Sequence, residues 1–537
     1  MNKAVPITLA LACFGGGYTA ASWYFGKQTE ATLSAQYEHM LDKAYNINLV
    51  DRDYQRGIFH STETLTLEII KDPAISAAID GEEYVAAKQQ LFKLTVHNDI
   101  QHGPIPGFST FAAASTDTDV MLIEGVEKEL AEQLANKTLF NQHMIFHFDG
   151  TGHATFNMPK LDLTLPGFID STTEKTAALS WDGMKGDMTF SADMAHFTLN
   201  ARSPIMTLTS SIGEKVNLSN IQISSEQQKA YEDIDALYSG IQHLSIDGIT
   251  LTTPKAEGTP FSAKQLTYDV NFAKDGDFLN LVEQIGIETA QIGQDKIGPF
   301  HFDFSLNHLH GHTLADIAKS LNAYNVKMSK SDKDQKAATE QLGQTVKKQG
   351  QHLLDNHPEF RIDRISLATA DGDTNLSGQV TLNKLNIEEA IENPFIMLGS
   401  LNATGKLSFN EKMILELLRN PPGSELMGLN DEASDEQMTR INMITEQFQQ
   451  QLAMFTGMGY LTRDGDSLKT HAEFKTGKLL INGKPFPPVA APTPIEQDST
   501  YIESDPSPME QESTTDKTDP TPMEEAPLSV EAKTTPN

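Results

Sequence analysis

Cysteine is almost absent from this chain, because only Cys13 among its 537 residues is a cysteine. A single cysteine excludes an intrachain disulfide, a zinc site built from cysteines and a Cys-x-x-Cys redox motif. Basic residues are also scarce: 41 Lys and Arg stand against 73 Asp and Glu, which gives a formal net charge of −32. Because recognition of nucleic-acid phosphates needs clustered positive charge, no nucleic-acid partner is predicted.

Sequence motifs for catalysis are missing as well. The chain has no nucleophile elbow, Walker loop, His-Glu-x-x-His zinc motif, EF-hand loop or dinucleotide fingerprint. No cofactor and no catalytic residue is therefore predicted, and an enzyme is the less favoured class. One group of histidines would place its last three members on one face of a strand, which is a pattern for Zn, Ni or Cu. Gly311 interrupts that strand, so solvent-facing histidines are the favoured interpretation and metal binding stays the alternative. The group consists of His301, His308, His310 and His312.

The N-terminal region contains a run of 21 uncharged residues, 5–25. As a helix it would measure about 31 Å, which matches the roughly 30 Å core of a bilayer. The positive-inside rule then places residues 1–4, with Lys3, in the cytoplasm and the main body on the other side of the membrane. The acidity of this body and its lack of cysteine suit a bacterial periplasm without requiring one. A cleaved signal peptide and a lipoprotein signal ending at Cys13 are the alternatives. Since the apolar run continues past Cys13, an uncleaved transmembrane anchor at 5–25 is the prediction.

The opposite end of the chain has the composition of a disordered segment. Residues 486–537 hold 10 of the 25 prolines and 11 acidic residues against two lysines. Such a stretch buries too little apolar surface to offset the entropy of ordering. The sequence therefore predicts a disordered acidic tail, as a solvated spacer or, alternatively, as an arm for a basic partner.

Between anchor and tail the pattern is that of strands. Leu65, Leu67 and Ile69 alternate with polar residues. Hairpin turns are predicted at seven Asp-Gly pairs and one Asn-Gly pair, several of which lie between such runs: Asp80, Asp149, Asp182, Asp247, Asp275, Asp371, Asp464 and Asn482, each with the following glycine. The predicted class is α+β, with long antiparallel twisted sheets and flanking helices, in an N-terminal β-rich half (27–260) and a C-terminal α+β half (261–485). Helical spacing marks 226–238, 314–324, 335–354 and 435–455.

An ordered set of short segments suggests a family. It includes Tyr54-Gln-Arg56-Gly57-Ile-Phe59, Gly298-Pro299-Phe300-His-Phe-Asp-Phe304, Pro358-Glu-Phe-Arg-Ile-Asp-Arg-Ile-Ser-Leu367, Gly459-Tyr460-Leu461-Thr462 and Gly477-Lys-Leu-Leu-Ile-Asn482-Gly483. With these segments the chain resembles, over residues 3–485, the YdgA-like family of bacterial envelope proteins, whose function is unknown. The resemblance implies a Gram-negative inner-membrane anchor with a periplasmic body, and it supplies no catalytic residues.

The predicted function is binding or scaffolding in the cell envelope, with a lipid or an envelope protein as partner besides the inner membrane. Long strands that curl without closing would leave an apolar face that a helix such as 435–455 covers only in part. Leu65, Leu67 and Phe304 are the candidate residues of that apolar groove, and a fully covered core without a groove is the alternative. A periplasmic enzyme without a recognisable motif and a chaperone-like partner of envelope or surface-structure proteins are the alternatives. The ligand and the oligomeric state are not predicted.

Overall fold

The computed structural model of the chain describes residues 4–43, 47–70, 91–166, 176–253, 261–293, 295–330, 335–383, 385–419 and 435–486. All these described residues belong to one compact unit, Met1–Pro488. The predicted acidic tail lies outside the described residues from residue 487 onward.

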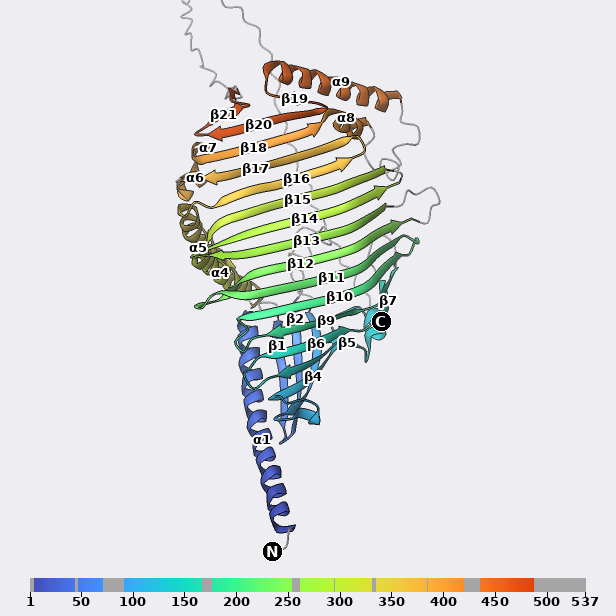
Figure 1. Ribbon diagram of the computed structural model, residues 1–537, viewed down its shortest axis with the longest axis vertical. Helices are drawn as coiled ribbons and strands as arrows, with labels where there is room; N and C mark the ends of the chain where they lie inside the picture. Colours follow the sequence, from blue (N-terminus) through green and yellow to red (C-terminus); the bar gives the residue numbers. More distant parts are fainter. Residues whose placement is uncertain are drawn as a thin grey trace, which may run out of the picture. The chain divides into compact units, whose positions relative to one another are not determined.

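One antiparallel sheet of 22 strands is the main element of the described residues (Figure 1). Its strands are β1 (Ile47–Arg56), β2 (His60–Ile70), β3 (Leu91–His102), β4 (Ala114–Glu124), β5 (Thr138–Phe146), β6 (Gly152–Met158), β7 (Leu161–Pro166), β8 (Thr176–Trp181), β9 (Met184–Phe190), β10 (His196–Ser210), β11 (Lys215–Tyr231), β12 (Ile234–Thr252), β13 (Phe261–Asp275), β14 (Phe278–Ile292), β15 (Asp295–His310), β16 (Glu359–Thr369), β17 (Gly372–Leu382), β18 (Leu401–Asn410), β19 (Thr462–Asp464), β20 (Ser467–Lys475), β21 (Lys478–Ile481) and β22 (Lys484–Pro485). The prediction of a sheet-rich α+β fold is confirmed.

The order of the sheet follows the chain over most of its width. Each strand from β10 to β18 pairs with the next one, and β20 pairs with β18. On the other side, β9 links β10 to β6, and β6 continues through β5, β4, β3 and β2 to β1. Strands from both predicted halves of the body therefore belong to the same sheet.

Short turns explain why neighbouring strands pair so regularly. Asp-Gly and Asn-Gly pairs adopt the positive φ values that tight hairpins need, and the glycines after Asp149, Asp182, Asp275 and Asp464 have positive φ between two strands. The Asn482-Gly483 pair does the same between β21 and β22. Gly372, after Asp371, also has positive φ and is the first residue of β17. The turn predicted at Asp247-Gly248 is wrong, because Gly248 lies inside β12 and pairs with Ser219 and Lys264 on both neighbours. The pair at Asp80 lies outside the described residues.

The helices are inserted between strands. They are α1 (Ala4–Lys43), the 3-10 turn η1 (Pro106–Phe108), α3 (Lys128–Leu134), α4 (Gly311–Lys330), α5 (Gln335–Asp355), α6 (Ile387–Glu392), α7 (Phe395–Ser400), α8 (Glu411–Arg419) and α9 (Asp435–Met458). The helices predicted at 314–324, 335–354 and 435–455 are confirmed as parts of α4, α5 and α9. The helix predicted at 226–238 is wrong: this segment forms the end of β11, a turn and the start of β12, because cross-strand pairing outweighs its helical composition.

Two clusters of buried apolar side chains lie where helices meet the sheet. Beneath α4, Ala230, Tyr231, Ile234 and Leu279 are closed to solvent, with Leu314 of α4 packed against them. Near the last strands, Leu452 of α9 packs with Phe409 and Leu468, and Ile414 of α8 completes this cluster. Helix α1 contacts β1, β3 and β4. The helices thus cover separate parts of the sheet (Figure 1).

The N-terminal segment 5–25 lies within the 40-residue helix α1. Within the part of the chain that the structure describes, no helix combines the length and the apolar character needed to cross a membrane. The transmembrane anchor predicted at 5–25 is therefore not confirmed.

Candidate functional site

A row of apolar side chains crosses eight consecutive strands, β11 to β18. Residues directly opposite one another on neighbouring strands lie on the same face of a sheet, and the strand register connects each member of this row to the next. All its members are half-buried. We call this set the first apolar row: Ile223, Leu244, Tyr268, Ile285, Phe302, Ile365, Leu376 and Leu407.

A second row runs beside the first one on the same face, since side chains two residues apart in a strand point the same way. We call it the second apolar row: Ile221, Ile246, Leu266, Ile287, Phe300 and Leu367. With roughly 4.8 Å between strands, eight strands make an apolar surface about 34 Å long. One leaflet of a bilayer is about 15 Å of hydrocarbon, so the surface is about twice as long as an acyl chain in a membrane.

The opposite face of the same strands is polar. The residues between the two apolar rows form the polar row: Gln222, Ser245, Thr267, Gly286, His301, Ser366, Asn375 and Ser408. A sheet with one polar and one apolar face exposes the first to water and must cover the second. Phe272 packs against the buried cluster beneath α4, and Leu407 packs against the buried cluster near the last strands. On the strands between these clusters, the members of the apolar rows are only half-buried.

The predicted groove residues lie on this face in different surroundings. Phe304 is half-buried next to the first apolar row, with its ring 5.6 Å from that of Phe302 and 6.4 Å from that of Phe360. Leu67 is half-buried and pairs with Leu49 and Leu94.

Leu65 lies farther from the rows, on β2. Only 2% of its surface is exposed, so it offers no accessible surface in this structure. The strand register from β2 to β11 places Leu65 on the same face as the apolar rows, at the end of the sheet that α1 covers.

A buried polar network holds α1 to this end of the sheet. The carboxylate of Glu63 is closed to solvent and accepts hydrogen bonds from Arg52 Nε at 2.7 Å, Asn98 Nδ2 at 2.8 Å and Tyr37 OH at 3.0 Å. Arg52 also donates to Ser34 Oγ of α1 at 2.9 Å. Burial, together with the Glu63 carboxylate, raises the pKa of Tyr37 well above its usual range. The network therefore stabilises the attachment of α1.

His102 is a second buried polar contact under α1. Its Nδ1 donates to the carbonyl of Ile58 at 2.9 Å, and its Nε2 lies 2.9 Å from Ser61 Oγ. Burial lowers the pKa of His102, so the neutral ring is the favoured form. On α1, Ser22 Oγ donates to the carbonyl of Gly103 at 2.6 Å, and the backbone of Gly26 approaches the His102 ring so closely that a Cβ there would lie 2.4 Å from it.

The histidine group is dispersed among different partners. His301 belongs to the polar row, and His308 stacks on Phe278 with 3.7 Å between ring centroids. His310 Nδ1 lies 2.8 Å from Thr313 Oγ1, whose hydroxyl lies 2.6 Å from Nδ1 of His352. No set of three or more His, Cys, Asp or Glu residues within the described stretches is arranged to hold a metal ion. His312 Nε2 lies 3.2 Å from Asp233 Oδ2, outside the His310 chain.

One large hollow lies away from the apolar rows, between α5 and the segment that contains α6 and α7. Its volume is about 1100 Å³. Side chains of both charges line it, among them Lys347, Lys348, Asp355, Glu388 and Glu389. Such a lining suits a solvated groove between helices and offers little to an apolar ligand.

Sequence reasoning found the alternation in single strands but missed the continuous rows. Leu244 and Ile246, or Ile285 and Ile287, show the period of two in the sequence, yet the neighbour of each depends on register. Glu63 was also missed, although its position is informative: it occupies an apolar phase of β2, two residues before Leu65. A charged residue in such a phase is a sign of a buried pair.

Comparison with known proteins gives a family and nothing finer. Residues 1–489 match a family described as bacterial proteins of unknown function, DUF945. Neither a curated protein nor a solved structure matches the chain. Because the match covers most of the chain, this protein belongs to the DUF945 family of bacterial proteins of unknown function.

Proposed function

We propose that this protein binds acyl chains of lipids along the two apolar rows, as a binding protein of the bacterial cell envelope. The observation that carries this proposal is the first apolar row, which continues over eight strands and contains no charged residue; the hydroxyl of Tyr268 is its only polar side-chain group. We place the protein at the inner membrane with its body in the periplasm, in line with the uncharged segment 5–25 and the resemblance to YdgA-like proteins.

The chemistry of the rows favours a hydrocarbon over a peptide. The backbone groups of the central strands already pair with both neighbours, so a peptide lying on this face would find no ladder to join. Its own amide groups would lose water without gaining partners, which costs several kcal/mol for each group in an apolar setting. An acyl chain has no such groups, and its burial is favourable wherever the surface is apolar.

The energetics indicate exchange with a membrane. About 0.8 kcal/mol for each buried methylene gives about 8 kcal/mol for ten methylenes taken from water. An acyl chain in a bilayer is buried already, so its transfer to the sheet changes the buried apolar area little. The face would therefore take up and release lipids readily when it has access to a bilayer. Tyr268, a member of the first apolar row, donates a hydrogen bond of 3.0 Å to Glu283, which lies beside the row on β14.

Photocrosslinking tests the occupant. A photoreactive phenylalanine analogue replaces Phe302 or Ile285 in the full chain, and as a control it replaces His301, whose side chain lies on the opposite face of β15. After irradiation in cells, mass spectrometry should find lipid attached at Phe302 and Ile285 and none at His301. Equal labelling at the three positions, or protein adducts in place of lipid at Phe302 and Ile285, would contradict the proposal.

A charge placed in the row provides a second measurement. Leu376→Glu should lower the amount of lipid that co-purifies with the full chain, because a carboxylate in the first apolar row disfavours hydrocarbon. Asn375→Glu is the matched control, since Asn375 is the preceding residue, exposed on the polar face. If both variants retain the same amount of lipid as the parent protein, the lipid does not lie on the rows.

A further inference from the structure

We propose that a collar of exposed aromatic side chains around α1 contacts the interfacial layer of a phospholipid bilayer. The aromatic collar consists of Trp23, Tyr24, Phe59, Phe108, Phe111 and Phe148. Phe108 is 83% exposed and Phe111 is 72% exposed, and the four other members are between 43% and 56% exposed. This inference does not depend on what the apolar rows bind.

The members of the collar come from separate segments and gather around one part of α1. Tyr18 stacks between two of them, with ring centroids 5.8 Å from Phe59 and 5.8 Å from Phe108. The Tyr18 hydroxyl also donates to the carbonyl of Ile105 at 2.9 Å. Phe59, which directly precedes β2, and Phe108, in the loop after β3, therefore meet on one side of the helix.

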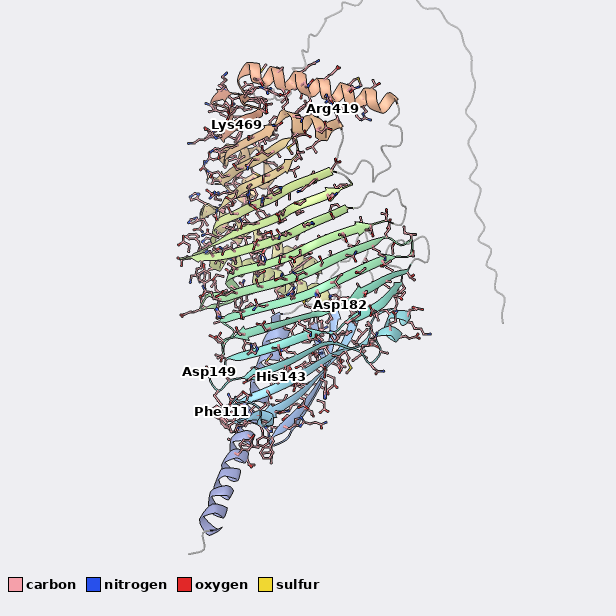
Figure 2. All side chains as sticks on the ribbon, turned by 45° about the vertical axis from the view of Figure 1, so that its right-hand side comes forward. Phe111, His143, Asp149, Asp182, Arg419 and Lys469 are labelled. Atoms are coloured by element: carbon pink, nitrogen blue, oxygen red, sulfur yellow. The ribbon has the colours of Figure 1, made fainter. Side chains whose placement is uncertain are left out.

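A second set of ring contacts lies about two turns farther along the same face of α1. Phe25 of α1 lies 5.1 Å from Phe148, and Phe148 lies 4.8 Å from Phe111. Figure 2 shows Phe111 close to the place where α1 leaves the strands. These rings pack on one another while large parts of them face outward, which is costly in water unless another apolar phase covers them.

Five of the six collar members lie in segments without charge, although the chain is strongly acidic. No Asp, Glu, Lys or Arg occurs in the segments 18–26, 57–59 and 103–113, whereas Asp149 follows Phe148 directly; the whole chain carries a net charge of −32. A polyanionic surface would be repelled by anionic headgroups, whereas uncharged aromatic rings are the side chains that favour the membrane–water interface. The charge distribution thus fits contact with a bilayer at this place.

The path of α1 supports the same occupant. At Gly26 the helix touches the sheet, whereas a Cβ added at Gly17 would meet nothing within 4 Å. From there to Ala4 the helix continues through residues without charge, and Figure 1 shows this end running away from β1 and β4. A bilayer receives both an uncharged helical segment and the ring of aromatic side chains at its base. A protein partner would account for the rings alone.

Quenching by brominated lipids tests this inference on the full chain reconstituted in phosphatidylethanolamine–phosphatidylglycerol vesicles that contain brominated phosphatidylcholine. The chain has only two tryptophans, so Trp23→Phe with Trp181→Phe leaves a background without this fluorophore. Phe108→Trp or Phe111→Trp then introduces one reporter. We expect a blue-shifted emission and a loss of fluorescence with brominated lipid at both positions. Phe395→Trp is the matched control, because Phe395 is 78% exposed and lies on α7, and it should keep its fluorescence.

A second variant keeps the natural reporter. In the Trp181→Phe background, Phe108→Asp together with Phe111→Asp should reduce the quenching of Trp23, whereas Phe395→Asp should leave it unchanged. Reporters at 108 and 111 that are quenched no more than the one at 395 would overturn the inference, as would a Trp23 that is insensitive to both charges. Lipid crosslinks on the apolar rows would be unaffected by either result, so this failure is distinct from failure of the proposed function.

Discussion

Replacement of Glu63 by alanine is expected to loosen α1 from the sheet. The Glu63 carboxylate has no exposed surface and receives hydrogen bonds from Arg52, Asn98 and Tyr37. Alanine leaves these three donors without their common acceptor and leaves the Arg52 guanidinium without its carboxylate partner. Removal of one partner from a buried ion pair costs about 3–5 kcal/mol. Because 24% of the Arg52 side chain is exposed, water compensates part of the loss, and we expect a value of about 3 kcal/mol.

Glu63→Gln separates the charge from the shape of this side chain. The glutamine amide keeps one oxygen as an acceptor, but an NH2 group replaces the other oxygen. This NH2 group is a donor and would face the donors of the neighbouring side chains. We expect a loss of about 2 kcal/mol, since a hydrogen bond to a charged group contributes about 1.5–3 kcal/mol. The measurement is native-state hydrogen exchange of the β2 and β3 amides, which reports the free energy of local opening.

The control is Glu124→Ala. Glu124 pairs with Lys93 near the same end of the sheet, but 57% of its side chain is exposed. An exposed ion pair contributes about 0–1 kcal/mol, so this variant should change the opening free energy little. If Glu63→Ala lowers the opening free energy of β2 and β3 no more than Glu124→Ala does, the buried network does not hold α1, and the reasoning is refuted.

Three further predictions concern α1, the pH and the tail. Gly26→Ala should lower the free energy of unfolding by about 1–3 kcal/mol, and with it the thermal midpoint, because the added Cβ would lie 2.4 Å from the His102 ring. Gly17→Ala has open space around it and should raise the stability of the helix by up to about 1 kcal/mol. Equal effects of the two variants in thermal melts would contradict this packing. Burial lowers the pKa of His102, so the folded state binds fewer protons than the unfolded state, and the stability should fall as the pH drops below about 6.5. His102→Gln should make the stability depend less on pH in thermal melts recorded from about pH 8 to about pH 5. An unchanged pH dependence in this variant would contradict the role of His102. Deletion of residues 499–537 should leave the thermal midpoint unchanged, because a segment so rich in proline and acid contributes little to a core, and a clear fall would mean that it docks.

The local features of this fold can be predicted from the sequence alone. Alternation such as Leu65, Leu67 and Ile69 specifies a strand with one apolar face, and the Asp-Gly pairs specify hairpins, because both depend on residues a few positions apart. An ambiguous local pattern gives a wrong prediction at two places. The segment 226–238 has helical spacing but forms the end of β11, a turn and the start of β12, and the Asp247-Gly248 pair has turn residues but lies inside β12. Their conformation is decided by pairing with neighbouring strands, which no short window contains.

The candidate site depends on tertiary structure for a different reason. The first apolar row exists only because the strand register places Ile285 opposite both Tyr268 and Phe302, and a slip by one residue would move a strand's apolar side chains to the other face. Leu65 has the same alternation as the members of the row, yet α1 covers its end of the sheet. The sequence by itself determined that apolar strand faces exist, because period-two alternation is local; the tertiary structure decided which of them join and which are covered, because register and helix packing unite residues far apart in the chain.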